Sequence, residues 1–368
     1  MLQVQNAKAF MGALKTLSKI PNKFGSTGGI RIASNGSTTI AAWDLDTRAI
    51  VSFPCETSQN AWETSFDAKA IGGLKVSKGT TLAIGSDGAI HVDGAIHTLP
   101  TLAPDADRDP SLDAPETTAH MATTVAGLRH VLENTSYCAS TDNTRYYLNG
   151  VLLETDAYTL RCVATDGHRM AIRETSADRY GEIPQGFILP IPAVRATLAL
   201  LKGMDGATPV KLGFTVDAKT IVISFGSATI VARRVDGEFP DWRQVIGSSA
   251  DPKIAIVRDV PRCAKMIDAF KGAHRMTMKA SALDTVLALF IGADGPMGSA
   301  ALPIEIDTLA VERHGRTIDC VISPAYMLEA LEYSDGPVYV AMRDDRSPMH
   351  LYTDGQTDPI AVIMPMQR

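Results

Sequence analysis

Apolar residues recur at helical spacing in several segments of the chain. Phe10, Leu14 and Leu17 share one helix face, and Leu128, Val131 and Leu132 share another. The first turns carry helix-start signals, with Asn6 and Ser323 as expected N-caps and Pro192 and Pro324 near first-turn positions. The pattern predicts paired amphipathic helices near Asn6–Ile20 and Asp67–Lys75, Val125–Tyr137 and Ile191–Lys202, and Val260–Lys271 and Pro324–Tyr333.

Segments rich in β-branched residues lie between the helices and predict strands. These segments are Ile30–Ile32, Thr38–Trp43, Val151–Leu153, Arg161–Ala164, Thr220–Phe225 and Thr317–Val321. Asp-Gly pairs predict hairpin turns at Asp87-Gly88, Asp93-Gly94, Asp294-Gly295 and Asp354-Gly355. Three times an apolar strand is expected to be followed by a similar closing pair, at Leu99-Pro100, Phe239-Pro240 and Met364-Pro365.

These patterns together predict an α+β fold of three repeated domains, each with two helices packed on antiparallel sheet. The expected domains are residues 1–116, 117–243 and 244–368. Their linkers are expected at Pro104–Thr118, which is rich in Pro and Asp, and after Trp242. A chain of 368 residues with 45% hydrophobic residues is long enough for two or three cores.

The composition limits the cellular compartment and the kinds of binding site that are expected for this protein. The N-terminus lacks the pattern of a secretory signal, and no apolar run is long enough to span a membrane, so a cytoplasmic protein is expected. The five cysteines are scattered without a C-x-x-C pair, which argues against disulfides and zinc. No metal or cofactor is expected. The net charge of −6 speaks against a uniformly basic nucleic-acid surface, although the total does not show how the charges are distributed.

The most informative segment is residues 145–172. It predicts two strands, the second of which runs into an Asp166-Gly167 turn with His168 and Arg169 on its far side. This segment resembles the middle domain of the bacterial DNA polymerase III β subunit family, the replicative sliding clamps. Two further segments, Arg234–Arg243 and Val362–Arg368, resemble the same family in the same order.

The resemblance implies a non-catalytic clamp. Two chains would close head to tail into a homodimeric ring, with helices lining the hole and sheets forming the rim. The ring would encircle double-stranded DNA without reading its sequence and would tether the DNA polymerase III catalytic subunit for processive replication. The clamp loader and other proteins with a clamp-binding motif are the further partners implied.

The candidate DNA contacts are basic helix residues and two tyrosines that match family positions near the ring face. For each basic residue the ordinary alternative is a solvated helix face, and for the tyrosines it is packing within a sheet. The candidates are Lys15, Lys19, Lys23, Lys69, Lys75, Arg129, Tyr146, Tyr147, Arg195, Lys202 and Lys265, and the same helices also carry Lys8, Lys78, Arg262 and Lys271.

The resemblance also implies a pocket that takes partner peptides with Leu and Phe anchors. Met and Val side chains would form deformable walls, while His168 and Arg169 could bind a peptide carbonyl or carboxylate. For Val362–Met366 alternation is expected, with alternate residues packed in the core and the others facing the groove. The matching positions are Leu148, Thr165, Gly167, His168, Arg169, Met170, Pro240, Val245, Val362, Ile363, Met364, Pro365 and Met366.

Some positions depart from the family pattern, and other functions stay open. Gln367 stands where the family usually has a basic residue, and Gly94 falls near a bulky apolar position at the family's subunit contact. The segment His274–Pro303 matches poorly. Cys162, Asp166 and His168 could compose a nucleophile set, but a strand and a turn separate them. The main alternative is a clamp-like peptide-binding scaffold, as in a plasmid or phage paralogue, that does not encircle DNA.

Overall fold

The computed structural model describes most of the chain. The described residues are 2–4, 7–20, 29–34, 37–44, 46–53, 61–73, 82–85, 87–99, 101–102, 113–246, 253–269, 275–280, 286–291, 299–306, 318–344, 346–355 and 358–366. The chain forms two compact units, one of residues Met1–His130, Leu153–Leu160 and Thr175–Asp236, the other of Val131–Leu152, Arg161–Glu174 and Gly237–Arg368. Residues 117–243 thus contribute to both units, and the division into three domains stays a prediction.

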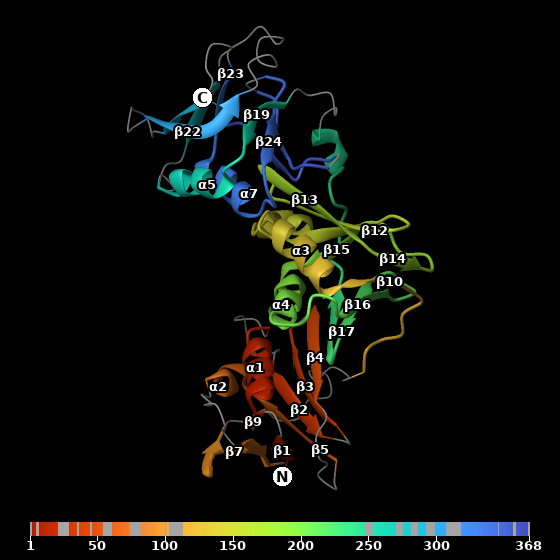
Figure 1. The fold of residues 1–368 in the computed structure, drawn as a ribbon. Helices are drawn as coiled ribbons and strands as arrows, with labels where there is room; N and C mark the ends of the chain where they lie inside the picture. Colours follow the sequence, from red (N-terminus) through yellow and green to blue (C-terminus); the bar gives the residue numbers. More distant parts are fainter. Residues whose placement is uncertain are drawn as a thin grey trace. The chain divides into compact units, whose positions relative to one another are not determined.

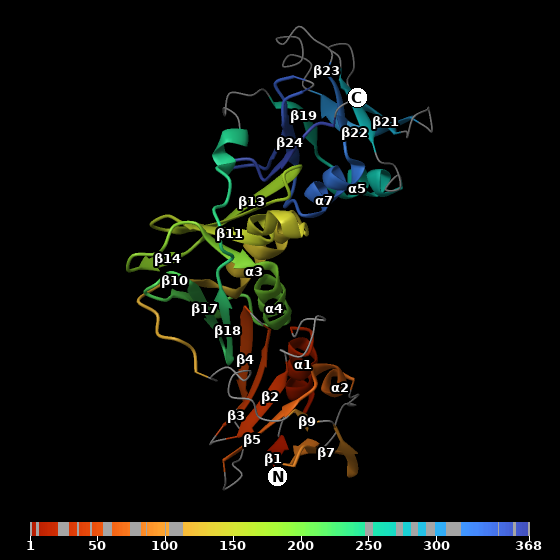
Figure 2. The same cartoon turned by 180° about the vertical axis from the view of Figure 1, so that it is seen from behind.

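The first unit holds two antiparallel sheets (Figures 1 and 2). The smaller has the order β1-β6-β7-β8, formed by Leu2–Val4, Leu82–Ile84, Ala89–Val92 and Ala95–Thr98. The larger has the order β14-β10-β16-β17-β18-β4-β3-β2-β5-β9. Its strands are Asp178–Tyr180, Ala119–Thr124, Pro209–Phe214, Thr220–Phe225, Ala228–Arg233, Thr47–Phe53, Thr38–Trp43, Ile30–Ser34, Trp62–Phe66 and Thr101–Leu102.

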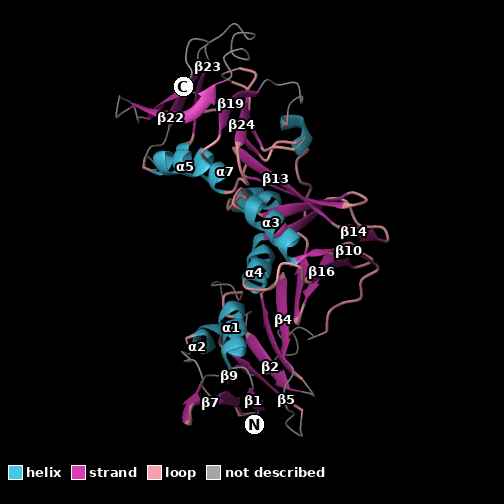
Figure 3. Cartoon of the chain, viewed as in Figure 1, coloured by secondary structure: helices cyan, strands magenta, loops and turns pink. Residues whose placement is uncertain are grey.

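Helices cover one face of the larger sheet, as Figure 3 shows. Helix α1 (Ala7–Leu17) packs on β3 and β4, and α4 (Ile191–Leu201) packs on β4 and β18. Phe10, Leu14 and Leu17 are buried, which confirms the predicted apolar face of α1. Helix α2 (Ala68–Gly72) is shorter than the predicted Asp67–Lys75; it begins where the Asp67 carboxylate accepts the Ala70 N–H at 3.0 Å. The short strand β15 (Phe187–Pro190) leads into α4.

Four elements contribute residues to both units, namely α3 (Val125–Ser136), β11 (Gly150–Thr155), β12 (Thr159–Thr165) and β13 (Arg169–Ser176). In the second unit the sheet continues from β13 in the order β26-β25-β24-β19-β22-β21-β20-β23. These strands are Ala361–Ile363, Met349–Tyr352, Val338–Ala341, Lys253–Val257, Ser299–Ile306, Val286–Ile291, Met276–Ala280 and Ile318–Ile322. Helices α5 (Val260–Asp268) and α7 (Pro324–Glu332) pack together beside it, and two 3-10 helices, η1 and η2, span Asn143–Leu148 and Trp242–Val245.

Turn chemistry follows the sequence at the described Asp-Gly pairs. Asp93 and Gly94 join β7 to β8 with φ angles of 50° and 82°, the positive pair that a tight hairpin requires. Asp87-Gly88 joins β6 to β7, and Asp354-Gly355 follows β25. Asp294-Gly295 and Asn6 lie outside the described residues.

Two local predictions hold only in part. A strand precedes Leu99 as predicted, but all four side chains of this strand, β8, are exposed. Ser323 is the N-cap of α7 as predicted, but it makes no side-chain capping bond; its carbonyl accepts the N–H of Met327 at 3.2 Å. The helix has Pro in its first turn, which leaves one fewer N–H to satisfy.

Candidate functional site

The predicted turn between β12 and β13 is confirmed. The Asp166 carboxylate accepts the N–H groups of His168 and Arg169 at 2.8 and 3.0 Å. Gly167 has a φ of +88°, a conformation that only glycine adopts without strain. The Thr165 hydroxyl donates to the Arg169 carbonyl at 2.7 Å and closes the turn. The turn therefore exposes His168 at its tip and starts β13 at Arg169.

The C-terminal strand β26 joins β13 directly. The antiparallel ladder pairs Arg169 with Ile363 and Met170 with Val362. Beyond the ladder, the Met364 N–H donates to the His168 carbonyl at 2.8 Å. Two segments nearly 200 residues apart, which the sequence assigned to one pocket, therefore meet in space.

Burial along the C-terminal segment differs from the expected alternation. Val362 and Ile363 are both 1% exposed, whereas Met364, Pro365 and Met366 are all half-buried. Strand β26 lies between β13 and β25 and packs on α7. A strand covered on both faces buries consecutive residues, so the side chains that can face a ligand begin only at Met364.

The Arg169 side chain is engaged on every side. Its Nε lies 3.1 Å from the Asp166 carboxylate, and its Nη2 donates to the Tyr137 carbonyl at 3.0 Å. It forms an ion pair with Glu329, and its guanidinium stacks 4.5 Å from the ring centroid of Tyr326. Glu329 and Tyr326 belong to α7, so Arg169 fastens that helix to the start of β13. Its donors are used within the unit, which leaves exposed His168 as the group that can meet a peptide.

The residues before β11 form a 3-10 helix rather than the predicted strand. The Asp142 carboxylate accepts the backbone N–H and the hydroxyl of Thr144 at 2.9 and 2.8 Å, which starts η1. Tyr146 is therefore 52% exposed and Tyr147 half-buried, and neither packs within a sheet. Leu148 ends η1 and is buried.

Helix η1 contacts both neighbouring segments of the predicted pocket. The Arg145 side chain lies over Gly167, where an added Cβ would meet Arg145 Nη1 at 2.8 Å. A Cβ at Gly237 would lie 3.1 Å from that of Tyr147. The segment that leads to Pro240 therefore runs beside η1, and Pro240 itself is exposed.

Val245 is placed by η2. Trp242 is buried, and the guanidinium groups of Arg161 and Arg243 lie 5.6 and 4.2 Å from its ring centroid. The Val245 carbonyl lies 2.9 Å from Nε2 of His350, a β25 residue paired with Val362. The Val245 side chain is 38% exposed. All four segments of the predicted pocket are thus linked by contacts within the second unit.

Burial divides the predicted pocket residues into two groups. Leu148, Met170, Val362 and Ile363 are buried and can serve as its floor. Except for half-buried Arg169, whose side chain is held within the unit, the others offer surface to a ligand, with Gly167, His168, Pro240 and Val245 exposed and Thr165, Met364, Pro365 and Met366 half-buried.

Sequence reasoning missed three residues that support this region, namely Tyr326, Glu329 and Arg173. Arg173 is 2% exposed and donates to the carbonyls of Ile360 and Tyr333, both at 2.6 Å. Burial lowers the pKa of its guanidinium. The sequence signal was available, since an arginine that directly follows the apolar run of residues 170–172 in a strand must find partners in the core.

The predicted DNA contacts are distributed over the helices. On α1, Lys8 and Lys15 are exposed, and Lys19 is exposed in the following turn. Arg195 and Lys202 are exposed on and just after α4, as are Arg262 and Lys265 on α5. Arg129 is half-buried and donates to the Leu201 carbonyl at 2.7 Å. Lys69 lies in α2, and Lys23, Lys75, Lys78 and Lys271 lie outside the described residues.

The suggested nucleophile set is not assembled. Cys162 is fully buried in β12, and burial raises the pKa of its thiol. The Asp166 carboxylate is committed to the turn and to Arg169. His168 is exposed at the turn tip.

Comparison with known proteins shows which proteins this arrangement resembles. Residues 123–241 match the central domain of the DNA polymerase III beta subunit. The beta sliding clamp of Pseudomonas putida is 28% identical over 246 residues, which are 65% of this chain and 63% of that protein. The beta sliding clamp of Escherichia coli is 32% identical over 143 residues, 39% of this chain and 37% of that protein. The chain is thus a divergent relative of bacterial beta sliding clamps, and it spans less than two thirds of the length of these relatives.

Solved structures of the family match the whole chain. The sliding clamp of Bartonella birtlesii, solved bound to griselimycin, has a TM-score of 0.85 at 23% identity and covers 100% of this chain and 99% of its own. The β subunit of Thermotoga maritima has a TM-score of 0.84 at 18% identity, with the same coverage. These likenesses confirm the predicted α+β fold of a sliding clamp over the full length. None of the helices in the described ranges is long and apolar enough to cross a membrane.

Proposed function

We propose that this protein is a sliding clamp. Two chains close head to tail around duplex DNA, and the ring tethers the DNA polymerase III catalytic subunit without taking part in its chemistry. The observation that carries the proposal is the convergence of η1, the Asp166 turn, η2 and the C-terminal strand on one surface within a full-length clamp fold. Clamp loader and other clamp-binding-motif proteins would use the same surface, in a cytoplasmic setting.

The exposed cations support DNA encirclement. In α1 and α4, apolar residues face the sheet while Lys8, Lys15 and Arg195 lie on the opposite, solvent-facing side. Such residues reach phosphates but not base edges, which gives contacts without sequence preference and with strong salt dependence. Tyr146 adds an exposed aromatic ring. A net charge of −6 favours a ring held by topology over a tight static complex.

The β8 edge supports a second copy as partner. This strand ends the smaller sheet and exposes all four of its side chains, among them Ile96 at 64%. An uncovered edge strand with an exposed apolar side chain is a template for pairing with another chain. In a head-to-tail ring this edge would meet the second unit of the partner chain.

Peptide docking is supported by the chemistry of the convergent surface. Met364, Pro365, Met366 and Val245 offer partly exposed apolar walls, and His168 offers a polar group beside them. Met side chains adapt to several ligands, which suits a surface shared by many partners. A short peptide with Leu and Phe anchors is the expected ligand.

Loading on DNA tests the proposal. A clamp loaded on nicked circular DNA should stay bound and should be released when the circle is cut. Light scattering after size exclusion should give twice the chain mass. A monomer that binds the Leu and Phe peptide yet is retained equally on circular and linear DNA would instead identify the scaffold alternative.

A further inference from the structure

The Asp166 turn, the start of β13 and the C-terminal strand β26 form the backbone frame of the predicted peptide pocket, which is the C-terminal groove. The same backbone arrangement occurs a second time, within the first unit. There the Asp44 carboxylate accepts the N–H groups of Asp46 and Thr47 at 3.0 and 2.7 Å, as Asp166 does for the turn residue His168 and for Arg169, the first residue of β13. The Arg233 N–H donates to the Asp46 carbonyl at 2.9 Å. Its counterpart in the second unit is the bond from the N–H of Met364.

The pairing of the two strands, and the path of the chain after them, are also the same in the two units. Strand β4 pairs Arg48 with Val231, in the place where β13 pairs Met170 with Val362. Two residues after Arg233, the Val235 N–H donates to Ile188 at 3.0 Å, and two residues after Met364, the Met366 N–H donates to Val321 at 2.7 Å. The two junctions therefore share turn, ladder and exit path, residue for residue.

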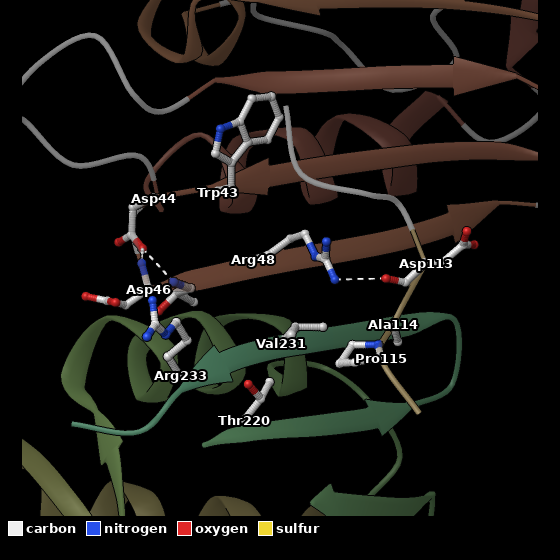
Figure 4. Close-up of a pocket in the computed structure, with 11 residues that line it drawn as sticks. Trp43, Asp44, Asp46, Arg48, Asp113, Ala114, Pro115, Thr220, Val231 and Arg233 are labelled. Carbon is white, nitrogen blue, oxygen red and sulfur yellow. Dashed lines mark hydrogen bonds between the residues drawn. The ribbon is translucent and has the colours of Figure 1, made fainter. Parts of the chain in front are cut away.

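A groove of about 530 Å³ lies on this second frame (Figure 4). It is lined by counterparts of the predicted pocket residues, including Arg48, Val231 and Arg233, and by the linker residues Asp113, Ala114 and Pro115. In Figure 4 the Arg48 side chain reaches across the groove toward the linker, and its Nη2 donates to the Asp113 carbonyl at 2.9 Å. The linker thus forms one wall.

The side chains give this groove a different chemistry. Arg48 and Arg233 stand where the C-terminal groove has Met170 and Met364, while Val231 keeps the valine of its counterpart Val362. Arg233 is exposed, and its guanidinium has no partner among the described residues. This groove therefore has arginines where the C-terminal groove has methionines, beside a valine at the same position in both.

Carboxylates in the groove limit what it can bind. Asp44 is occupied by the turn, and burial is the main cause that raises its pKa. Asp46 and Asp113 also line the groove and are exposed. A uniformly acidic ligand would meet these two groups, so carboxylates are favoured only opposite Arg48 and Arg233.

We propose that the β4–β18 groove is a second docking site, which takes an extended peptide of a partner protein with an aliphatic side chain between two carboxylates. The aliphatic group rests on Val231 and Pro115, and the carboxylates pair with Arg233 and Arg48. The inference rests on the proposed function in one respect, since peptide binding at the C-terminal groove is what marks this frame as a peptide site.

The test measures fluorescence anisotropy of the labelled acidic peptide Ser-Asp-Leu-Asp-Ser, which has one carboxylate on each side of its leucine, with the full chain. Arg233→Glu should weaken its binding at least tenfold. Lys219→Glu, an equal charge change on an exposed residue that does not line the groove, should leave it unchanged. The control peptide Ser-Lys-Leu-Lys-Ser, in which both carboxylates are replaced by ammonium groups, should not bind the native protein.

A second peptide with Leu and Phe anchors separates the two proposals. Its affinity should be insensitive to Arg233→Glu and should be lost when Met364–Arg368 are removed, whereas the acidic peptide should still bind that truncated chain. Equal affinity of the acidic peptide for native and Arg233→Glu protein, no saturable binding, or loss on truncation would overturn the second site. Failure of the Leu and Phe peptide alone would overturn only the C-terminal groove.

Discussion

The N–H of Met364 donates to the carbonyl oxygen of His168 across 2.8 Å. This bond continues the β13–β26 ladder by one step beyond Ile363. It brings the C-terminal segment against the turn whose tip is His168. The tail and the turn are therefore two walls of one surface, and each depends on the other for its position.

Removal of Met364–Arg368 should abolish binding of a Leu and Phe peptide while leaving the dimer intact. The truncation deletes two backbone hydrogen bonds, from Met364 and Met366, which amounts to about 1–3 kcal/mol of stability. Strand β26 keeps its pairing to both neighbours through Ala361–Ile363. Calorimetry and light scattering check the two halves of this expectation. Unchanged peptide affinity would refute the pocket, and loss of the dimer or unfolding would make these residues chiefly structural.

Arg169→Ala should destabilise the protein and weaken peptide binding together. The change leaves Glu329 without its cation and removes the stacking on Tyr326, so a loss of roughly 3 kcal/mol is expected. Arg179→Ala is the matched control, because that guanidinium is exposed and, among the described residues, donates to the nearby Gly181 carbonyl alone. Urea unfolding at neutral pH measures both. An Arg169→Ala protein as stable as the control would show that the contacts of Arg169 with α7 contribute nothing to the free energy of unfolding.

Gly167→Ala should cost more than Gly203→Ala. Both glycines have positive φ, +88° and +82°, so each substitution carries about 1–2 kcal/mol of backbone strain. Only at Gly167 does the added Cβ meet a neighbour, Arg145 Nη1 at 2.8 Å, while Gly203 has open space. Thermal unfolding of the two variants isolates the steric part of the effect. Equal losses in the two variants would mean that Arg145 yields freely.

The sequence predicted the elements with strong local signals. Periodic apolar residues located α1, α3, α4, α5 and α7, and the Asp-Gly pairs located turns. It failed where a single side chain redirects the backbone, as Asp142 does when it starts η1 in place of a strand. It also failed where burial depends on distant elements. The covering of β26 on both faces, and the use of Arg169 by α7, follow from packing that local periodicity does not contain.

Stability should fall as pH rises above about 9 because of the buried thiols. Burial raises the pKa of Cys138 from 9.0 to about 12, so the folded protein keeps a proton that the unfolded chain releases in that window. The unfolded state then binds fewer protons, and the free energy of unfolding decreases with pH by at most about 1.4 kcal/mol per pH unit for each such thiol. Comparison of native and Cys138→Ala protein at pH 8 and pH 10 measures the effect, and the variant should show the shallower slope. Identical slopes would mean that this thiol ionises in the folded state.

Ile96→Asp should weaken the homodimer at least tenfold. The strand that carries Ile96 ends its sheet with all four side chains exposed, and an isoleucine that is 64% exposed is expected to be covered by a partner chain. An aspartate there would place a charge in an apolar contact and would disfavour pairing along the edge. Tyr158→Asp is the control, because Tyr158 is 77% exposed at a hairpin tip outside that sheet. Light scattering over a range of micromolar concentrations should show monomer for the first variant and dimer for the second. If the Ile96→Asp protein remains a dimer, the subunit contact lies elsewhere. If both variants are monomers, the added negative charge weakens the dimer wherever it is placed, and the result says nothing specific about Ile96.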